Sequence, residues 1–321
     1  MINFKDDIEA VDSLREKYKS FQKEVSKAIF GQEQVIKEVL LTVFSGGHAL
    51  LVGVPGLAKT MLINTISKIL NLKYKRIQFT PDLMPSDIIG TEILDKNRDF
   101  SFIPGPIFAN IILADEINRT PPKTQAALLE AMQEKSVTAS GKTYKLEDPF
   151  FVLATQNPIE QEGTYPLPEA QLDRFMFNIL LDYPNFEEEK LIVKNTTSEY
   201  NFELSEIISS EEILYYQQLL KRVPINDNVI NYAISLTQKT RPQQPLSTDF
   251  TNKYISWGAG PRASQYLVIG AKTNAILKGK YSPDIEDVKE VAFPVLRHRI
   301  VRTFRAEAEG YNTDKIIKEL L

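Results

Sequence analysis

The sequence predicts an α/β domain with a parallel sheet, followed by a small all-α domain. In the first part of the chain, short apolar runs that end in polar or charged residues alternate with amphipathic stretches of helical spacing. This alternation is typical of a doubly wound parallel sheet that is covered on both faces. Beyond Tyr183-Pro184 the apolar residues recur at helical spacing only. With 321 residues the chain is long enough for two domains, which we place at residues 1–184 and 185–321.

The composition is that of a globular chain with a sizeable core, with 43% hydrophobic and 25% charged residues. The chain has no cysteine and two histidines, which excludes disulfides and cysteine ligands and argues against a histidine-built metal site or a Ser/His triad. Its net charge of −4 argues against nucleic-acid binding over the whole surface. No apolar run approaches the roughly 18 residues of a membrane span, and the N-terminus lacks a signal-peptide pattern. We therefore expect no membrane insertion and a cytoplasmic location.

A strand, a glycine turn and a helix follow one another around Gly53. Ala49 to Val52 is a short apolar run, and an apolar stripe at helical spacing begins at Leu62. Between them lies a loop of Gly53, Val54, Pro55, Gly56, Leu57, Ala58, Lys59 and Thr60. Such a loop turns its backbone N–H groups toward a phosphate, which also meets the positive end of the helix dipole. Lys59 can reach the β- and γ-phosphates, and the Thr60 hydroxyl can ligate the Mg²⁺ that bridges them.

Ala58 departs from the usual form of this loop, which has glycine before the lysine. Because alanine carries a Cβ atom, we expect it to fit only if its backbone keeps a negative φ. With this departure, the loop alone is consistent with several kinds of nucleotide-binding protein.

A helix junction precedes the loop. One amphipathic helix is expected from Ile8 to Ile29 and a second from Gln32 to about Phe44, with the break at Phe30-Gly31. This junction is either an ordinary helix break or an apolar wall for a flat base. On the second interpretation, the residues that contact a nucleotide are Phe30, Gly31, Gly53, Val54, Pro55, Gly56, Leu57, Ala58, Lys59, Thr60 and Met61.

Two further apolar runs end in polar residues that suit the same site. The run Ile111 to Ala114 ends in Asp115 and Glu116, and a later run, Phe150 to Thr155, is followed by Asn157. Parallel sheets place their sites at the carboxyl ends of strands. There Asp115 would support the Mg²⁺, Glu116 would activate the attacking water, and Asn157 would bind that water or the γ-phosphate. Each feature alone also fits a strand meeting a loop or a turn residue before proline.

The segments between these strands contain turn signals. Lys75 to Phe79 predicts a strand, and Thr120-Pro121-Pro122 predicts a helix start in which Thr120 is the cap. Thr91 to Ile103 and Ser136 to Leu146 predict two protruding hairpins.

The C-terminal part predicts a helical lid without a convincing strand. The expected helices begin at Glu187, Glu211, Asn228, Arg262 and Asp284, and Thr251 to Pro261 is expected to be a loop. A basic run near the end consists of Arg297, His298, Arg299, Arg302 and Arg305. Such a run is usually a solvated face, although it can instead contact a neighbouring subunit or an acidic partner.

Two isolated arginines have open assignments. Arg174 precedes the strand expected at Phe175 to Leu181, and Arg262 lies in the first turn of a lid helix. An isolated arginine is usually solvated or paired with an acid, but phosphoryl transfer gains greatly from a cation that a neighbouring subunit brings in.

Taken together, these stretches resemble the AAA+ ATPases, and within them the MoxR family. The resemblance covers nearly the whole chain and is carried by Gly53 to Thr60, Gln78 to Gly90, Ala114 to Arg119, Ala154 to Pro158 and Pro166 to Phe175. It implies a P-loop αβα sandwich with a parallel sheet and a helical lid. Ala58 is the form usual within MoxR proteins, whereas Gly260 stands where the family commonly has serine before the proline.

The resemblance also implies roles for the candidate residues. It makes Gly53 to Thr60 the Walker A motif with Lys59 on the phosphates, Asp115-Glu116 the Walker B motif and Asn157 sensor 1. Arg174 corresponds to an arginine finger that acts in trans, and Arg262 to sensor 2, which links nucleotide state to lid angle. The two hairpins correspond to inserts that face the central pore of related rings.

The resemblance implies an ATPase that uses ATP and Mg²⁺, releases ADP and works as a homo-oligomer, most simply a hexameric ring. Its partners would be protein clients, such as proteins with von Willebrand A domains, in a chaperone-like remodelling or assembly reaction. Two alternatives remain open: a DNA-remodelling motor, which the acidic net charge disfavours, and a nucleotide-gated binding switch with little turnover.

Overall fold

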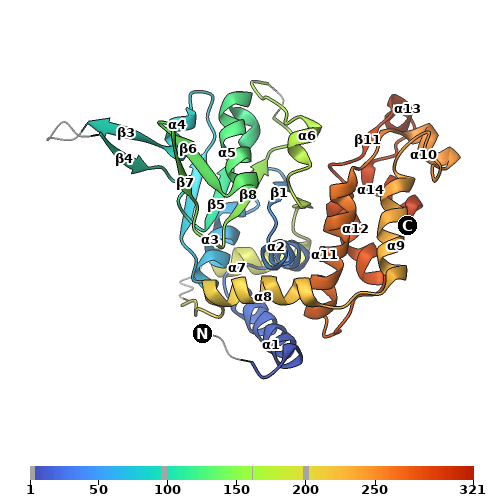
Figure 1. Ribbon diagram of the computed structural model, residues 1–321, viewed down its shortest axis with the longest axis horizontal. Coiled ribbons are helices and arrows are strands. Elements are labelled where there is room, and N and C mark those ends of the chain that lie inside the picture. The colour runs from blue at the N-terminus through green and yellow to red at the C-terminus, as the bar shows by residue number, and fades with distance from the viewer. Residues whose placement is uncertain (1–3, 95–99, 161, 198–201) are drawn as a thin grey trace.

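The computed structural model describes residues 4–94, 100–160, 162–197 and 202–321. Its centre is a five-stranded sheet in the order β2-β5-β8-β1-β9, in which all neighbouring strands are parallel (Figure 1). The strands are β1 (Ala49–Val52), β2 (Tyr74–Gln78), β5 (Ile111–Asp115), β8 (Phe151–Gln156) and β9 (Phe177–Leu180). The predicted parallel sheet is confirmed. Because β5, β8 and β1 are neighbours, their carboxyl ends meet at one edge of the sheet.

Both faces of the sheet are covered by helices, which explains why the central strands β1, β5 and β8 are apolar runs without alternation. Leu51 packs in a core with α1 (Asp7–Val25), α2 (Glu33–Ser45) and α3 (Lys59–Ile69). Its neighbour Leu50 points to the other face, where it packs in a core with α5 (Pro122–Glu134). The expected αβα sandwich is therefore present.

Two hairpins stand beside the sheet and lie against each other (Figure 1). The first pairs β3 (Gly90–Leu94) with β4 (Phe100–Pro104), and the second pairs β6 (Ser136–Ala139) with β7 (Lys142–Lys145). Both predicted hairpins are confirmed, although residues 95–99 of the first lie outside the described ranges. The rings of Phe102 and Tyr144 stack across the two hairpins with centroids 4.1 Å apart.

The C-terminal part is a helical lid beside the sheet domain (Figure 1). Its helices are α9 (Asp227–Lys239), α10 (Asp249–Tyr254), α11 (Pro261–Leu277), α12 (Ile285–Leu296), α13 (Phe304–Ala308) and α14 (Thr313–Leu320). The expectation of a lid without strands is wrong, because β10 (Ile255–Trp257) pairs antiparallel with β11 (Val301–Arg302). Both strands are too short to show a period in the sequence, and α10 occupies part of the expected loop.

Two helices connect the sheet domain to the lid. They are α7 (Phe186–Thr196) and α8 (Ser210–Arg222). The Gln217 amide of α8 donates to the Val43 carbonyl of α2 at 2.8 Å, and Tyr216 meets Phe44 edge to face. Helix α8 thus packs on the sheet domain, while the division at residues 184 and 185 stays a prediction. In the described part of the chain, no helix combines the length and apolar composition that crossing a membrane requires.

Three smaller sequence expectations differ from the structure. Helix α1 ends at Val25, several residues before the predicted break. The cap of α5 is Pro121 and not Thr120, with Pro122 as its first residue. The short helix α4 (Pro85–Ile89) was not predicted, because its five residues form little more than one turn.

A candidate site for nucleotide binding and hydrolysis

The phosphate loop and the ends of β5 and β8 line one cleft of about 440 Å³. Its walls are Pro55, Gly56, Leu57, Ala58, Lys59, Thr60, Met61, Asp115, Glu116 and Asn157. Residues from three separate stretches of the chain thus meet, because their strands are neighbours in the sheet.

The loop turns tightly between β1 and α3. A Cβ atom at Gly53 would lie 2.8 Å from the Leu181 Cβ atom, so this residue must be glycine for the loop to pass the end of β9. Lys59 donates to the Gly53 carbonyl at 2.6 Å, which holds the ammonium group over the loop. Partial burial lowers the pKa of Lys59 below its usual value, and the nearby Asp115 and Glu116 carboxylates offset only part of this effect.

Ala58 does not have the conformation expected from the sequence. Its φ is +53°, in the left-handed region, so the expectation of a negative φ is wrong. An L-residue costs roughly 1–2 kcal/mol in this region. This strained residue lies at the boundary between the loop and α3, which begins at Lys59.

Asp115 is held by two neighbours that the sequence analysis did not single out. Its Oδ2 atom accepts from Arg76 Nη2 at 2.6 Å and from Arg76 Nε at 3.0 Å. Its Oδ1 atom accepts from the Thr155 hydroxyl at 2.6 Å. Thr155 also accepts the backbone N–H of Glu116 at 2.8 Å. One buried hydroxyl on β8 therefore orients both acidic residues at the end of β5.

Glu116 has a strained backbone, with a φ of +58°. Its Oε2 atom accepts from Gln78 Nε2 at 2.9 Å and from Arg119 Nη1 at 2.8 Å. Both donors reach the same oxygen, so the carboxylate has a fixed orientation in the cleft. The three-residue spacing between Glu116 and Arg119 is a sequence signal for one of these donors. Gln78 is identified only by the structure, in which it ends β2 and pairs in register with Asp115.

Asn157 is 5% exposed and lies where the sequence analysis predicted, at the end of β8. Its Oδ1 atom accepts from the Ile159 N–H at 3.1 Å. The side-chain carbonyl is therefore used in a local turn, and the Nδ2 hydrogens are the donors that remain for a phosphate or a water molecule.

Thr60 and Asp115 fit the predicted Mg²⁺ site. They offer a hydroxyl and a carboxylate oxygen in one cleft, which are the ligand types that Mg²⁺ takes. The described residues contain no cluster of three or more His, Cys, Asp or Glu side chains that could hold a metal. A site with few protein ligands suits Mg²⁺, which commonly keeps waters and phosphate oxygens as its other ligands.

The junction between α1 and α2 lies next to the loop. Gln32 donates from Nε2 to the Leu57 carbonyl at 3.3 Å, and its Oε1 atom is buried without a partner. Gln32 also lines a second cleft of about 340 Å³, together with Tyr183 and Arg297. Phe30 and Gly31 directly precede Gln32, and Gly31 has a φ of +70°. Their contact with a base stays a prediction.

Arg174 and Arg262 lie together, away from the phosphate loop of their own chain. Both line a cavity of about 200 Å³ that shares no residue with the loop cleft. Arg174 Nε donates to Gln133 Oε1 at 3.1 Å, and Arg262 Nη1 is 3.3 Å from Asp173 Oδ2. Within one chain, neither arginine completes the phosphate site.

Comparisons with known proteins agree with this fold and site. A family model described as "ATPase family associated with various cellular activities (AAA)" matches residues 48–177, and an "AAA lid domain" model matches residues 249–320. A solved structure of a putative ATPase from Cytophaga hutchinsonii superposes with a TM-score of 0.90 at 44% identity, covering 97% of this chain and 95% of that one. The fold and the site therefore define an AAA+ ATPase, which hydrolyses ATP.

Two curated relatives narrow this class. Chaperone MoxR1 of Mycobacterium tuberculosis is 41% identical over 299 residues, covering 93% of this chain and 79% of the relative. The uncharacterized protein YeaC of Bacillus subtilis is also 41% identical over 299 residues, covering 92% and 91%. The chain belongs to the MoxR family of AAA+ ATPases.

Proposed function

We propose that this chain couples ATP hydrolysis in an oligomeric ring to the remodelling, assembly or activation of protein clients. The observation that carries the proposal is the separation of the catalytic groups. Lys59, Asp115 and Glu116 line the loop cleft, whereas Arg174 and Arg262 line another cavity. Within the chain, Arg76 and Arg119 are already paired with Asp115 and Glu116, so a neighbour can supply a further cation for the transition state.

Within the cleft each predicted residue has a role that its position supports. The loop amides and Lys59 bind the phosphates, and Asn157 orients water or the γ-phosphate through its Nδ2 group. Glu116, held by two donors on Oε2, accepts the proton of the attacking water on its other oxygen. Thr60 and Asp115 would hold Mg²⁺, which neutralises charge on the phosphate oxygens when it is bound.

The neighbour would contribute Arg174 as the arginine finger, and Arg262 would report nucleotide state to the lid. A shared site requires a head-to-tail interface, which forms a ring when the rotation between subunits closes, and a hexameric ring is the form that we propose. The protruding hairpins expose apolar side chains, including Leu94 and Phe100, which are 57% and 72% exposed. Such side chains suit contacts with protein clients, and we propose proteins with von Willebrand A domains as one class.

The test is the Glu116→Gln variant, which keeps the shape of the side chain and removes its basicity. We expect ATP binding to persist and kcat to fall at least about 100-fold, the usual contribution of a general base. Native mass spectrometry with ATP should show an oligomer, and a pull-down with this variant should enrich protein clients. Undiminished ATP turnover in the variant would refute the role of Glu116. A protein that stays monomeric without nucleotide, with ATP and with ADP would refute the shared site. ATPase activity that DNA stimulates at moderate salt would favour a DNA-remodelling motor instead.

A further inference from the structure

Arg299 is the most enclosed member of the C-terminal basic run. Its side chain is 2% exposed, so the expectation of a solvated face is wrong for this residue. Its neighbour His298 is also buried. The sequence could not show this, because the turn between α12 and β11 is buried by contacts with residues 173–176, which lie more than 100 positions away in the chain.

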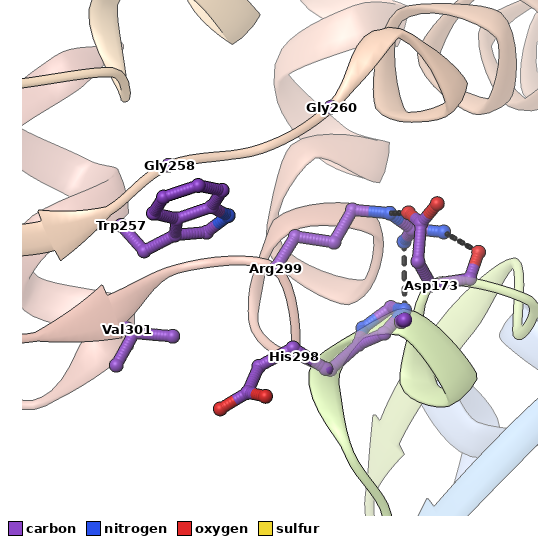
Figure 2. Close-up of a pocket in the computed structure, with 9 residues that line it drawn as sticks. Asp173, Trp257, Gly258, Gly260, His298, Arg299 and Val301 are labelled. Carbon is purple, nitrogen blue, oxygen red and sulfur yellow. Dashed lines mark hydrogen bonds and ion pairs between the residues drawn. The ribbon is translucent and has the colours of Figure 1, made fainter.

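The guanidinium group of Arg299 pairs with Asp173 of the sheet domain (Figure 2) and also contacts the Val295 carbonyl and His298 Nε2 beside it in the lid. Its other hydrogen bonds reach the same short segment of the sheet domain, residues 173–176. Its Nε atom donates to Asp173 Oδ1 at 2.7 Å, and Nη2 donates to the Asp173 carbonyl at 2.9 Å. Nη2 also donates to the Phe175 carbonyl at 2.7 Å, and Nη1 to the Met176 carbonyl at 3.2 Å. Arg174 lies inside this segment, so Arg299 binds the backbone carbonyls on both sides of Arg174.

A second lid residue also binds this segment. Tyr266, on α11, donates from its hydroxyl to the Arg174 carbonyl at 3.4 Å. The Arg299 guanidinium lies over the Tyr266 ring, 5.1 Å from its centroid. The carbonyls of residues 173 to 176 therefore bind side chains of the lid, from α11 and from the turn that follows α12.

Burial of an arginine is costly unless it is paired and its donors are satisfied. Asp173 supplies the opposite charge and is shared with Arg262 at 3.3 Å. The planar fork of donors matches several carbonyl groups at once, which a lysine cannot do. The hydrogen bonds of Arg299 to residues 173–176 fix the backbone of this segment. The segment contains Arg174, the proposed arginine finger.

We infer that Arg299 is a positioning residue for Arg174, and that it transmits the orientation of the lid to the nucleotide site of the neighbouring subunit. This inference rests on the proposed role of Arg174 in trans. Arg174 reaches the neighbour only if its backbone has the right direction, and a displacement of about 1 Å can cost roughly 100-fold in rate.

The main variant is Arg299→Lys, which keeps the charge for Asp173 and removes the fork. Arg305→Lys is the matched control, because it makes the same change at a residue that is 63% exposed and paired with Glu309. Tyr266→Phe is a milder lid variant that keeps the ring and removes the hydroxyl. We expect Arg299→Lys to lower kcat by about 10- to 100-fold with KM for ATP nearly unchanged, Tyr266→Phe to lower it less, and the control to behave as wild type.

Doubly tagged assemblies separate positioning from a purely structural role. Each variant is coexpressed with Glu116→Gln, whose sites are inactive but whose Arg174 is intact. We expect both Arg174→Ala and Arg299→Lys to gain activity in these mixed assemblies, because the neighbour supplies a correctly placed finger. If mixed assembly restores ATPase activity to Arg174→Ala but not to Arg299→Lys, the inference about Arg299 is overturned and the proposed function stands. No gain for Arg174→Ala, or no mixed assembly, would overturn the proposed function. Wild-type kcat in Arg299→Lys, or loss of ATP binding through unfolding, would also count against the inference.

Discussion

At the residue scale, a single hydroxyl forms hydrogen bonds with both acidic residues of the site. Thr155 is 1% exposed, donates to Asp115 Oδ1 and accepts the Glu116 N–H. Its position on β8, opposite the end of β5, follows from the strand order. The bridge adds to the Arg76 bonds on Asp115, and it holds the backbone of Glu116 where that backbone is strained.

Replacing Thr155 by valine should therefore damage hydrolysis more than its conservative shape suggests. The change keeps the volume but leaves the Glu116 N–H and the Asp115 carboxylate without this partner. We expect a loss of about 1–3 kcal/mol in the free energy of unfolding and a fall in kcat. Chemical denaturation and steady-state kinetics measure the two effects.

Thr155→Ser is the matched control, since it keeps the hydroxyl and removes only a methyl group. It should retain most of the wild-type kcat. Equal kcat values for the valine and serine variants would show that the hydroxyl does not orient the acids.

At the scale of elements, the two hairpins are joined by their aromatic side chains. Phe102 of β4 and Tyr144 of β7 stack at 4.1 Å, and Phe108 meets Phe102 edge to face at 5.8 Å. A two-stranded hairpin is only marginally stable alone, so each depends on the other for its orientation. The two hairpins should therefore behave as one unit.

The variant Tyr144→Ala tests this coupling. Loss of the stacked pair removes about 0.5–1.5 kcal/mol beyond the buried area. We expect faster amide hydrogen exchange in β3 and β4, which contain no substituted residue. Tyr144→Phe, which keeps the ring, should exchange as wild type. Unchanged protection of β3 and β4 in the alanine variant would contradict the coupling.

At the scale of the whole molecule, the two histidines link stability to pH. His48 lies in the core of the sheet domain, where it accepts the Val152 N–H at 3.0 Å and is 3.1 Å from the Met132 carbonyl. Burial lowers its pKa from 6.5 to about 4. Burial and the Arg299 cation also lower the pKa of His298 well below its usual value.

The unfolded chain binds protons at these histidines before the folded chain does. The stability contributed by the neutral form is present above pH 6.5 and is lost as the pH falls through the folded pKa of about 4. For His48 alone, we expect a loss of roughly 2 kcal/mol between about pH 7 and about pH 5. Urea unfolding at a series of pH values measures it.

The variant His48→Gln removes this titration and keeps one donor and one acceptor. Its unfolding free energy should fall less steeply with decreasing pH over the same range. An equal slope in the variant and the wild type would show that His48 does not supply the effect.

Particular residues show how far the sequence predicts this protein. The loop from Gly53 to Thr60, the acids Asp115 and Glu116, and Asn157 each follow an apolar run, and a parallel sheet brings such strand ends together. Their meeting in one cleft was therefore predictable. Thr155, Gln78 and Arg76 were not, because each lies within a strand and acquires its role only from the strand beside it. Ala58 shows the same limit, since its positive φ is a property of the folded loop that its residue type does not predict.

By itself, the sequence determined the parallel sheet, the covering helices and the nucleotide cleft, because these depend on local periodicity and on motifs with short spacing. Only the tertiary structure decided the environments of Arg174, Arg262 and Arg299. Their partners lie far along the chain, as the separation of 126 positions between Asp173 and Arg299 shows. A basic run has the same pattern on a solvated face and in a buried clamp, since the difference is made by the carbonyl groups and the carboxylate that the fold places around it.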